Sequence, residues 1–507
     1  MQPALERLGE LIVGSPGSVP ASTHFTGLSY DSRHVAAGDI FFCVPGQKTD
    51  GNEFIDDAVK AGAVCIVSER ALERQWPNVV FVTVKDVRLA LARLADFFYD
   101  HPSRLVRLIG VTGTNGKTTT THLVEHILQR SGHRVGLIGT LGARWETEPG
   151  KREYIDVKHT TPQATDLQEL LSQMAGKHLS HVAMEVSSHA LALKRVAECD
   201  FAVACLTNIT QDHLDFHRTM EHYWRSKRLL FEMLNASKQE NKTVIVNADD
   251  DLGEEFLSVI DSDVRQWTYG FAPNCDCSVV SATFDFRGTR LELKTPRGPL
   301  SLNLKLNGRF NVYNTMAAVL ICLAEGVSLA DCKTALEEFG GVAGRFEVVG
   351  SFGGNGVKEP LCIVDYAHTP DGLENVLRAA RALVPSDGRL IAVFGCGGDR
   401  DSSKRPQMGE LAEDLADDVV VTSDNPRTED PDQIIGDILS GIKRMNERIR
   451  VERDRSSAIK MAVEQSTDRD VIVVAGKGHE TYQILADRTI DFDDRLEVRH
   501  ALEARHK

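Results

Sequence analysis

The fold is decided by the stretch RLIGVTGTNGKTTTTHLVEHILQRSG at residues 107–132. An apolar run is followed by a Gly-rich turn and then by an amphipathic helical pattern. Gly113 and Gly116 let backbone N–H groups approach a phosphate closely, and the start of the following helix favours negative charge. Lys117 can bridge the terminal phosphates, and Thr118 can bind Mg²⁺. The strict form G-x-x-x-x-G-K-[ST] begins with Gly where this chain has Val111, so the sequence predicts a shortened phosphate-binding loop.

Outward from this loop, short apolar runs alternate with helical patterns on both sides. The runs VGLIGT, HVAMEVS, FAVACLTNI and TVIVNADD continue the central unit and predict a parallel sheet with crossover helices. Alternating segments over 278–306 predict antiparallel hairpins added to that sheet. GVAGRFEVV (341–349) and SFGGNGVKEP (351–360) resemble a linker, and a second alternation of strands and helices follows.

The sequence therefore predicts an α/β protein of three domains. A small mixed α/β domain covers 1–104, a central domain with the phosphate-binding loop, a parallel sheet and an antiparallel subsheet covers 105–345, and a Rossmann-like doubly wound domain covers 346–507.

Composition narrows the classes of protein that fit. The 507 residues carry a net charge of −15, which disfavours non-specific binding to nucleic acid or anionic membranes. No apolar run approaches the roughly 18 residues of a membrane span, and MQPALERLGE lacks the basic and apolar segments of a secretory signal. Ten scattered cysteines, many in apolar runs, are typical of reduced, buried thiols. We expect a cytoplasmic protein without nucleic-acid partners or membrane insertion.

Two segments of the central unit combine acidic and histidine residues just after apolar runs. One is MEVSSH with Glu185 and Ser187, and the other is TNITQDHLD with Asp212 and His213. Carboxylate oxygens and an imidazole close to a phosphate-binding loop suit Mg²⁺, although each segment alone fits a helix cap or a solvated loop. Lys227, in YWRSKRLLF, is by composition a solvated helix lysine.

Charged residues also stand at three predicted strand ends of the third unit. Arg400 lies in GGDRD, Arg427 in SDNPR and Glu480 in GKGHE. A guanidinium stiffened by Pro426 matches a carboxylate, and Glu480 complements an ammonium. Together they predict a pocket for an amino-acid zwitterion, while each alone is as readily a surface charge.

These segments, in this order, resemble the Mur ligases, the ATP-dependent enzymes that build the peptide of peptidoglycan. The resemblance covers essentially the whole chain and is closest to the branch that adds the third residue. Its motifs are DSR, TGTNGKTTT, HTTP, MEVSSH, TNITQDHLDFH, YWRSKRLLF, NGRFNVYN, GRFE, DYAHTP, GCGGDRD, DNPR and GKGHE. Three positions, Gln47, His159 and Leu193, depart from residues common in relatives.

The resemblance implies roles by position. Catalytic roles fall to Lys117, Lys227, His213 and Glu185. Contacts to ATP fall to Gly113, Thr114, Asn115, Gly116, Lys117, Thr118, Thr119, Asn311, Arg345 and Asp365. Contacts to the UDP substrate fall to Tyr30, Ser32, Gln47, Lys48, Thr49, His159, Thr160, Thr161, Ser187 and Arg195. The amino-acid pocket falls to Arg400, Asp424, Asn425, Pro426, Arg427, Gly476 and Glu480. Mg²⁺ falls to Thr118, Glu185, His213 and Lys227, the last as a carbamate (N6-carboxylysine).

The resemblance further implies ATP and Mg²⁺ as cofactors, UDP-MurNAc-L-Ala-D-Glu and meso-diaminopimelate as substrates, and a monomer. Three alternatives are a folylpolyglutamate synthetase, a non-catalytic ATP-driven binding module, and the L-lysine-adding homologue. The DSR unit and DNPR oppose the first, the amino-acid pocket motifs oppose the second, and the Arg of DNPR opposes the third.

Overall fold

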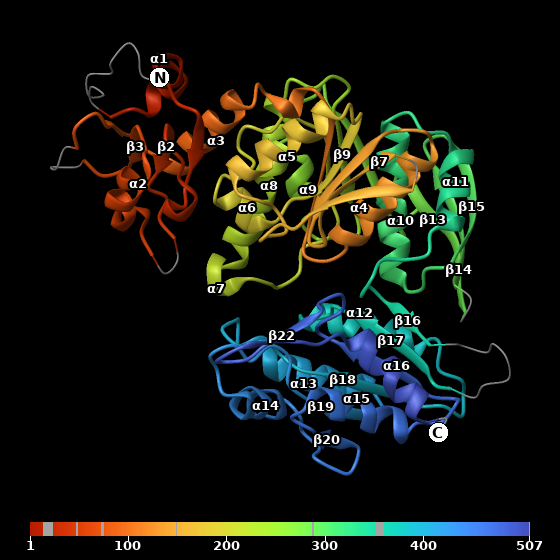
Figure 1. Ribbon diagram of the computed structural model, residues 1–507. Helices are drawn as coiled ribbons and strands as arrows, with labels where there is room; N and C mark the ends of the chain where they lie inside the picture. Colours follow the sequence, from red (N-terminus) through yellow and green to blue (C-terminus); the bar gives the residue numbers. More distant parts are fainter. Residues whose placement is uncertain are drawn as a thin grey trace.

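The computed structural model describes residues 1–13, 24–46, 49–71, 76–148, 150–285, 288–350 and 359–505, and these form three α/β units, each built on its own main sheet (Figure 1). The three sheets lie within the ranges 1–104, 105–345 and 346–507, whose limits stay predictions. The α/β class with a parallel-dominated central sheet is confirmed.

The first unit is a parallel sheet in the order β1-β2-β3-β4. Its strands are β1 (Gly27–Ser29), β2 (Asp39–Phe42), β3 (Cys65–Ser68) and β4 (Val80–Thr83). Its helices are α1 (Gln2–Leu8), α2 (Ile55–Ala61) and α3 (Val87–Phe98), with 3₁₀ turns η1 (Gly9–Leu11), η2 (Ser32–His34), η3 (Gly51–Phe54) and η4 (Pro102–Arg104). The apolar runs at 39–42 and 65–68 are buried along their whole length, as expected for inner parallel strands.

The central unit is one sheet in the order β15-β14-β13-β12-β11-β10-β5-β9-β6-β7-β8. Its strands are β5 (Arg107–Thr112), β6 (Val135–Gly139), β7 (Gly142–Glu148), β8 (Lys151–Ile155), β9 (His181–Glu185), β10 (Phe201–Leu206), β11 (Thr243–Asn247), β12 (Arg265–Gly270), β13 (Cys277–Asp285), β14 (Gly288–Thr295) and β15 (Gly298–Leu304). Pairing is parallel from β6 to β13 and antiparallel in the outer hairpins, which confirms the antiparallel segment predicted over 278–306.

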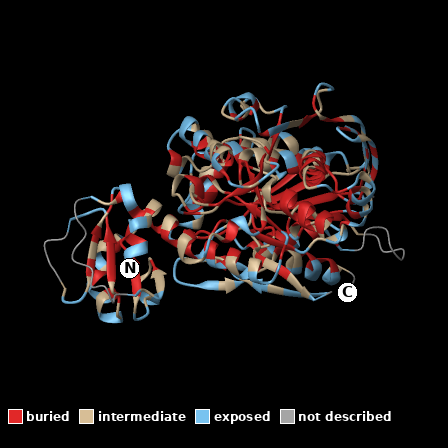
Figure 2. Ribbon diagram, turned by 90° about the horizontal axis from the view of Figure 1, so that it is seen from above, coloured by how far each residue is buried: buried red, intermediate tan, exposed pale blue. Residues whose placement is uncertain are grey.

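Helices cover both faces of this central sheet. They are α4 (Lys117–Arg130), α5 (Ala164–Gly176), α6 (Ser188–Ala192), α7 (Leu214–His217), α8 (Met220–Ala236), α9 (Gly253–Leu257), α10 (Arg309–Ala324) and α11 (Leu329–Glu338). One core joins α4, α10 and α11 to the sheet, and a second core joins α5 and α8 to the other side. The buried strands therefore form the centre of the unit in Figure 2.

The third unit is a sheet in the order β16-β17-β21-β18-β19-β20, parallel except for β16. Its strands are β16 (Glu347–Val349), β17 (Leu361–Asp365), β18 (Leu390–Phe394), β19 (Asp418–Val421), β20 (Ile449–Val451) and β21 (Val471–Ala475), and a separate hairpin holds β22 (Tyr482–Ile484) and β23 (Thr489–Asp491). Its helices are α12 (Pro370–Arg381), α13 (Lys404–Leu415), α14 (Pro431–Leu439), α15 (Arg455–Glu464) and α16 (Asp494–Arg505).

The linker predicted over 341–349 is wrong at its end. Glu347–Val349 is β16, and it pairs antiparallel with β17. Val349 is buried in the core that contains α15 and α16, so burial of this edge strand outweighs the loop signal of the glycines around it. Of the second linker segment, 351–358 lies outside the described residues.

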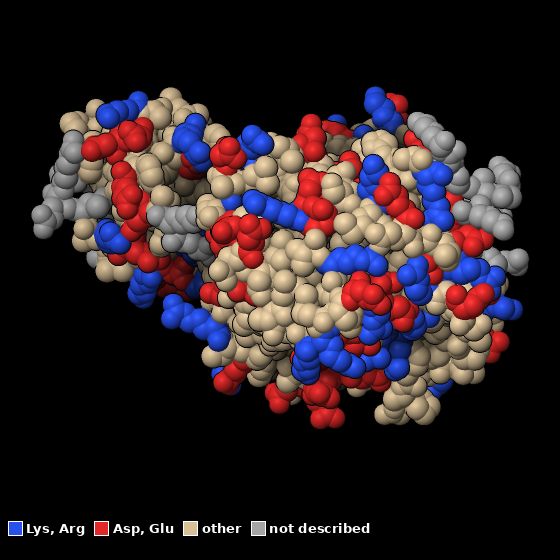
Figure 3. Space-filling model, turned by 90° about the horizontal axis from the view of Figure 1, so that it is seen from below, with Lys and Arg blue, Asp and Glu red and all other residues tan. Residues whose placement is uncertain are grey.

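The expectations drawn from composition can be compared with the structure. All ten cysteines are free, and all are buried, as predicted. Acidic and basic side chains are interspersed on the face drawn in Figure 3. No helix of the described residues is long and apolar enough to cross a bilayer.

Candidate active site

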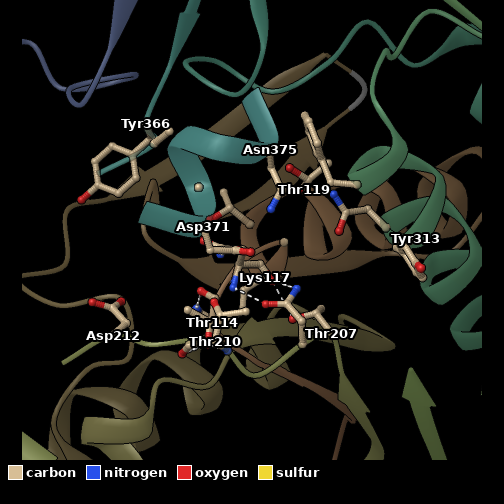
Figure 4. A pocket seen from close by; sticks show the side chains of 18 of the residues that line it. Thr114, Lys117, Thr119, Thr207, Thr210, Asp212, Tyr313, Tyr366, Asp371 and Asn375 are labelled. Carbon is tan, nitrogen blue, oxygen red and sulfur yellow. Dashed lines mark hydrogen bonds between the residues drawn. The ribbon is translucent and has the colours of Figure 1, made fainter. Parts of the chain in front are cut away.

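A cavity of about 680 Å³ lies where the carboxyl ends of the central strands face the third unit. The phosphate-binding loop, Glu185 at the end of β9 and Lys227 of α8 line it from the central unit, and Asp365 and Asp371 line it from the third unit. Figure 4 shows the start of α12, with Asp371, lying over Lys117 and Thr114. Parallel α/β sheets place their ligands at this edge, so the cavity is a candidate active site.

The Gly-rich loop takes the predicted turn between β5 and α4. Gly113 has φ 145° and Gly116 has φ 87°, values that favour glycine. A Cβ on Gly113 would stand 1.9 Å from Thr207 Oγ1, so no side chain fits there. Lys117 Nζ donates to the carbonyl oxygens of Gly113 and Thr114, each over 2.8 Å, and burial lowers its pKa.

Glu185 and Thr118 come together as predicted. Glu185 is fully buried, and its carboxylate accepts hydrogen bonds from Thr118 Oγ1 over 2.9 Å and from Thr140 N over 2.8 Å. Arg345 Nη2 approaches the same Thr118 hydroxyl within 3.3 Å. Glu185 and Thr118 therefore offer the hard oxygen ligands that Mg²⁺ prefers.

His213 lines the cavity in a left-handed conformation with φ 55°. Burial lowers its pKa to about 3 although Asp212, whose carboxylate lies 3.2 Å from Nε2, opposes the shift. A neutral imidazole has a free lone pair on one ring nitrogen and can coordinate a metal ion. No three His, Cys, Asp or Glu side chains of the described ranges form a ready metal cluster. The donor set still fits Mg²⁺, which usually keeps several waters and substrate phosphates beside one or two carboxylates.

Lys227 is not the solvated lysine that composition suggested. It is 1% exposed, and its Nζ donates to Gly113 O over 2.7 Å. The ammonium also lies 4.6 Å from the centre of the Tyr223 ring. Burial, together with the charge of Lys117, holds the pKa of Lys227 well below its usual value. The sequence could not show that α8 turns this face toward the loop.

Two of the three remaining residues assigned to the nucleotide line the cavity. They are Arg345, whose guanidinium lies 4.3 Å from the centre of the Tyr366 ring, and Asp365. Burial raises the pKa of Asp365, which accepts from the backbone N–H groups of Phe346 and Ala367. Asn311 lies behind the cavity wall, where its Oδ1 accepts from Asn314 Nδ2 over 3.1 Å.

The structure adds lining residues that the sequence did not single out. Asp371, in the first turn of α12, accepts a hydrogen bond from Asn115 Nδ2 and so ties the third unit to the phosphate-binding loop. An acidic residue after ThrPro at a helix start was the available signal. Further polar lining residues include Asn208, Asp249, Arg309, Tyr313 and Asn314.

The residues assigned to the UDP substrate are only partly gathered. Thr160 and Ser187 line the cavity, Thr161 Oγ1 donates to Glu185 O over 2.8 Å, and Arg195 Nη1 donates to Thr161 O over 2.9 Å. His159 is exposed beside Thr160, and Tyr30 donates to Asp166 of α5 over 2.8 Å. Ser32 begins η2, Thr49 follows in a loop, and Gln47 and Lys48 lie outside the described residues.

The residues assigned to the amino acid gather at the ends of β18, β19 and β21, apart from the walls of the cavity. Arg427, at φ 52° after Pro426, donates to Gly398 O over 2.8 Å, and Arg400 donates to Asp399 O over 3.1 Å. A Cβ on Gly397 would stand 3.0 Å from Arg427 Nη1 and 3.8 Å from Arg400 Cγ, so both arginines border this glycine.

Glu480 already has partners. Its Oε2 accepts from Asn425 Nδ2 over 2.8 Å and from Lys477 Nζ over 3.0 Å. Lys477 is fully buried and was not singled out, although its place between two glycines was a signal. Lys477 therefore lies with the residues assigned to the amino acid, in addition to Arg400 and Arg427.

Comparisons with known proteins agree along the chain. Three family models match: "Mur ligase family, catalytic domain" at 24–99, "Mur ligase middle domain" at 111–322, and "Mur ligase, glutamate ligase domain" at 344–478. A UDP-N-acetylmuramoyl-L-alanyl-D-glutamate–2,6-diaminopimelate ligase of Gloeobacter violaceus is 47% identical over 94% of both chains. The protein of the same name from Geobacillus thermodenitrificans is 45% identical over 94% of this chain and 95% of its own.

Solved structures agree with these sequence relatives. A structure carrying the same ligase name superposes with a TM-score of 0.66 at 34% identity, covering 95% of this chain and 96% of that one. The MurF ligase of Thermotoga maritima in complex with ADP has a TM-score of 0.62 at 21% identity, over 95% and 98% of the two chains, and shares the fold.

Proposed function

Because this chain belongs to the Mur ligase family, we propose that it is the ATP-dependent ligase that adds meso-diaminopimelate to UDP-MurNAc-L-Ala-D-Glu, with ADP and phosphate as by-products, in peptidoglycan biosynthesis. The observation that carries the proposal is the cavity at the phosphate-binding loop, where Lys117, Glu185 and Lys227 face the third unit.

The chemistry explains why such a loop is needed. A carboxylate is a poor acyl donor because its charge repels nucleophiles and oxide is a poor leaving group. Transfer of a phosphoryl group from ATP gives an acyl phosphate, which the amine then attacks with release of phosphate. Phosphoryl transfer depends mainly on positioning and on neutralising charge. Lys117, at the start of α4, supplies a cation at the phosphates, and the helix start adds its own positive dipole.

We assign Mg²⁺ to Thr118, Glu185, His213 and a carbamate on Lys227. When bound, the metal would neutralise the phosphates and the acceptor carboxylate. The remaining ATP contacts are the loop residues 113–119, Arg345 and Asp365, with Asn311 acting through Asn314. We assign Thr160, Thr161, Ser187 and Arg195 to the muramoyl peptide, as the hydrogen bonds around Thr161 support.

The three units divide the substrates. The first unit holds the UDP sugar, the second holds ATP and the third holds the amino acid. The protein works as a cytoplasmic monomer. The pocket at Arg427 is separate from the cavity walls, so reaction requires the third unit to move against the loop. The contact between Asn115 and Asp371 is one place where the two units already meet.

Phosphate release with ATP and Mg²⁺ tests the proposal. We expect release only when both UDP-MurNAc-L-Ala-D-Glu and meso-diaminopimelate are present, with little release when L-lysine replaces diaminopimelate. Release without either substrate would indicate an ATP-driven switch, activity on a folate substrate would indicate a folylpolyglutamate synthetase, and efficient use of L-lysine would indicate the lysine-adding branch.

A further inference from the structure

Arg455 stands in an unusual place for a cation. It is the first residue of α15, where the helix dipole disfavours positive charge, and it is 1% exposed. A buried guanidinium is stable only when its charge and its donors are satisfied. Its contacts therefore show what it holds.

Its ionic partner comes from the last helix of the described chain. Arg455 Nε and Nη2 donate to the two carboxylate oxygens of Asp494, each over 2.7 Å, and both side chains are fully buried. Asp494 lies in the first turn of α16, where an anion is favoured. The pair joins α15 and α16, which pack together (Figure 1).

The other donors of the guanidinium reach two strand ends. Nη2 donates to Ala475 O over 2.9 Å, and Nη1 donates to Ser423 O over 3.3 Å. Ala475 ends β21 and Ser423 follows β19, while β18 lies between these strands in the sheet. One side chain thus bridges two loops that do not belong to neighbouring strands.

The next residue after each of these carbonyl groups belongs to the amino-acid pocket. Gly476 follows Ala475 with φ 121°, and Asp424 follows Ser423. A Cβ on Gly476 would stand 2.4 Å from Asp424 Oδ2, so the two loops touch here. Further along, Asn425 donates to Glu480 and closes the same pair of loops.

Charge also couples the pair to the pocket. Burial lowers the pKa of Arg455, but the carboxylate of Asp494 raises it, and those of Asp424 and Glu480 add to the rise. The net shift of the pKa is upward, so the guanidinium keeps its charge.

We propose that Arg455 and Asp494 are positioning residues for the incoming amino acid. They fix the loops Asp424–Arg427 and Gly476–Glu480 relative to each other, without touching the substrate, and so set the affinity for the amino acid alone. This inference rests on the proposed function, in which these loops bind diaminopimelate.

The test is steady-state kinetics of Arg455→Lys, which keeps the charge but cannot serve Asp494 and both carbonyl groups with one planar fork. We expect the KM for meso-diaminopimelate to rise by about tenfold to a hundredfold, since a displacement near 1 Å costs that much. The KM values for ATP and UDP-MurNAc-L-Ala-D-Glu stay within about twofold, because the loop at 113–119 is on another unit.

Arg389→Lys is the matched control. Arg389 pairs with Asp470 over 2.8 Å and donates to Gln465 O, in the same unit but at the opposite ends of β18 and β21. Its KM for diaminopimelate is expected to equal that of the unmodified protein. If Arg455→Lys is not folded, the double variant Arg455→Met with Asp494→Leu replaces the charged pair by an apolar one and is judged by the same KM values.

The outcomes separate the two claims. If the protein with its natural sequence shows no activity with diaminopimelate, the proposed function is refuted. If the protein with its natural sequence uses diaminopimelate, three outcomes refute the positioning role alone. They are an unchanged KM for diaminopimelate in Arg455→Lys, an equal rise of all three KM values in Arg455→Lys, and an equal rise of the KM for diaminopimelate in Arg389→Lys. Failure of both Arg455 variants to fold also refutes it, because the pair would then support the whole unit.

Discussion

Lys117 and Lys227 donate hydrogen bonds to the same acceptor, the backbone carbonyl oxygen of Gly113, over 2.8 and 2.7 Å. Two buried ammonium groups at one oxygen repel each other, and the pKa of each is lowered, first by burial. The shift is the larger for Lys227, which favours its neutral amine. A neutral amine can react with CO₂, and the resulting carbamate would replace repulsion with attraction toward Lys117.

The first prediction concerns that modification of Lys227. We expect Lys227→Ala to lose most phosphate release and to recover part of it with added small carboxylates, which can take the place of a carbamate. The intact mass of the protein with its natural sequence should include the carbamate under non-acidic conditions. Arg225→Ala on the same helix, where Arg225 is solvent-exposed and paired with Glu221, is the control and should remain active. An active, Mg²⁺-loaded protein with an unmodified Lys227 contradicts this prediction.

Lys117→Ala should abolish phosphate release without unfolding the protein. The variant loses the ammonium and its two hydrogen bonds to the loop, but the positive φ values of Gly113 and Gly116 and the hydrogen bond from Lys227 to Gly113 O still hold the turn. Melting temperature and activity are measured together, with Arg130→Ala at the exposed end of the same helix as control. Near-normal turnover in Lys117→Ala would show that this loop does not hold the phosphates.

Arg427→Ala should raise the KM for meso-diaminopimelate by orders of magnitude and leave those for ATP and the UDP substrate nearly unchanged. Diaminopimelate has one more carboxylate than lysine, and a guanidinium can bind it through hydrogen bonds worth about 1.5–3 kcal/mol each. A site built for a polar group rejects an analogue without it by about 10⁴–10⁵-fold. Arg400 borders the same glycine and softens the loss. Unchanged kinetics in Arg427→Ala would remove this residue from the pocket.

Glu325 provides a prediction for stability against pH. Burial raises the pKa of its carboxyl group, but hydrogen bonds from Arg107 and His181 outweigh burial and lower it to about 2, from 4.5. The ionised form therefore stabilises the fold above pH 4.5, and this contribution is lost as the pH falls toward 2. The stabilisation is about 3.5 kcal/mol at most, because the pKa falls from 4.5 to about 2 and each tenfold change in proton affinity corresponds to about 1.4 kcal/mol.

The comparison uses melting temperatures of the unmodified protein and Glu325→Gln. We expect the variant to melt clearly lower at pH 7 and the gap to shrink between pH 4.5 and 2. Glu338→Gln, which loses an ion pair with Arg130 that is about half exposed, should change little at any pH. A gap that does not depend on pH would show that the Glu325 charge is not what stabilises the fold.

The local elements of this protein follow from its sequence. The phosphate-binding turn is fixed by Gly113 and Gly116, whose positive φ values need no distant partner, and the strands at 107–112 and 181–185 follow from unbroken apolar runs. The order of motifs also indicated the family and thereby the reaction. These features depend on residues close together in the chain, so their pattern can be recognised before folding.

Other features depend on residues far apart in the chain. Lys227 resembles a solvated lysine until α8 turns it toward Gly113, and 347–349 resembles a linker until β17 pairs with it. Likewise, only the structure shows that Asp371 accepts a hydrogen bond from Asn115 and that Arg455 pairs with Asp494. Packing between distant elements decides which side chains are buried and what they contact, and burial shifts the pKa values that decide whether these groups are charged. The sequence alone therefore determined the loop, the strands and the family. Only the tertiary structure decided which side chains form ion pairs and hydrogen bonds with each other and which of them line the site.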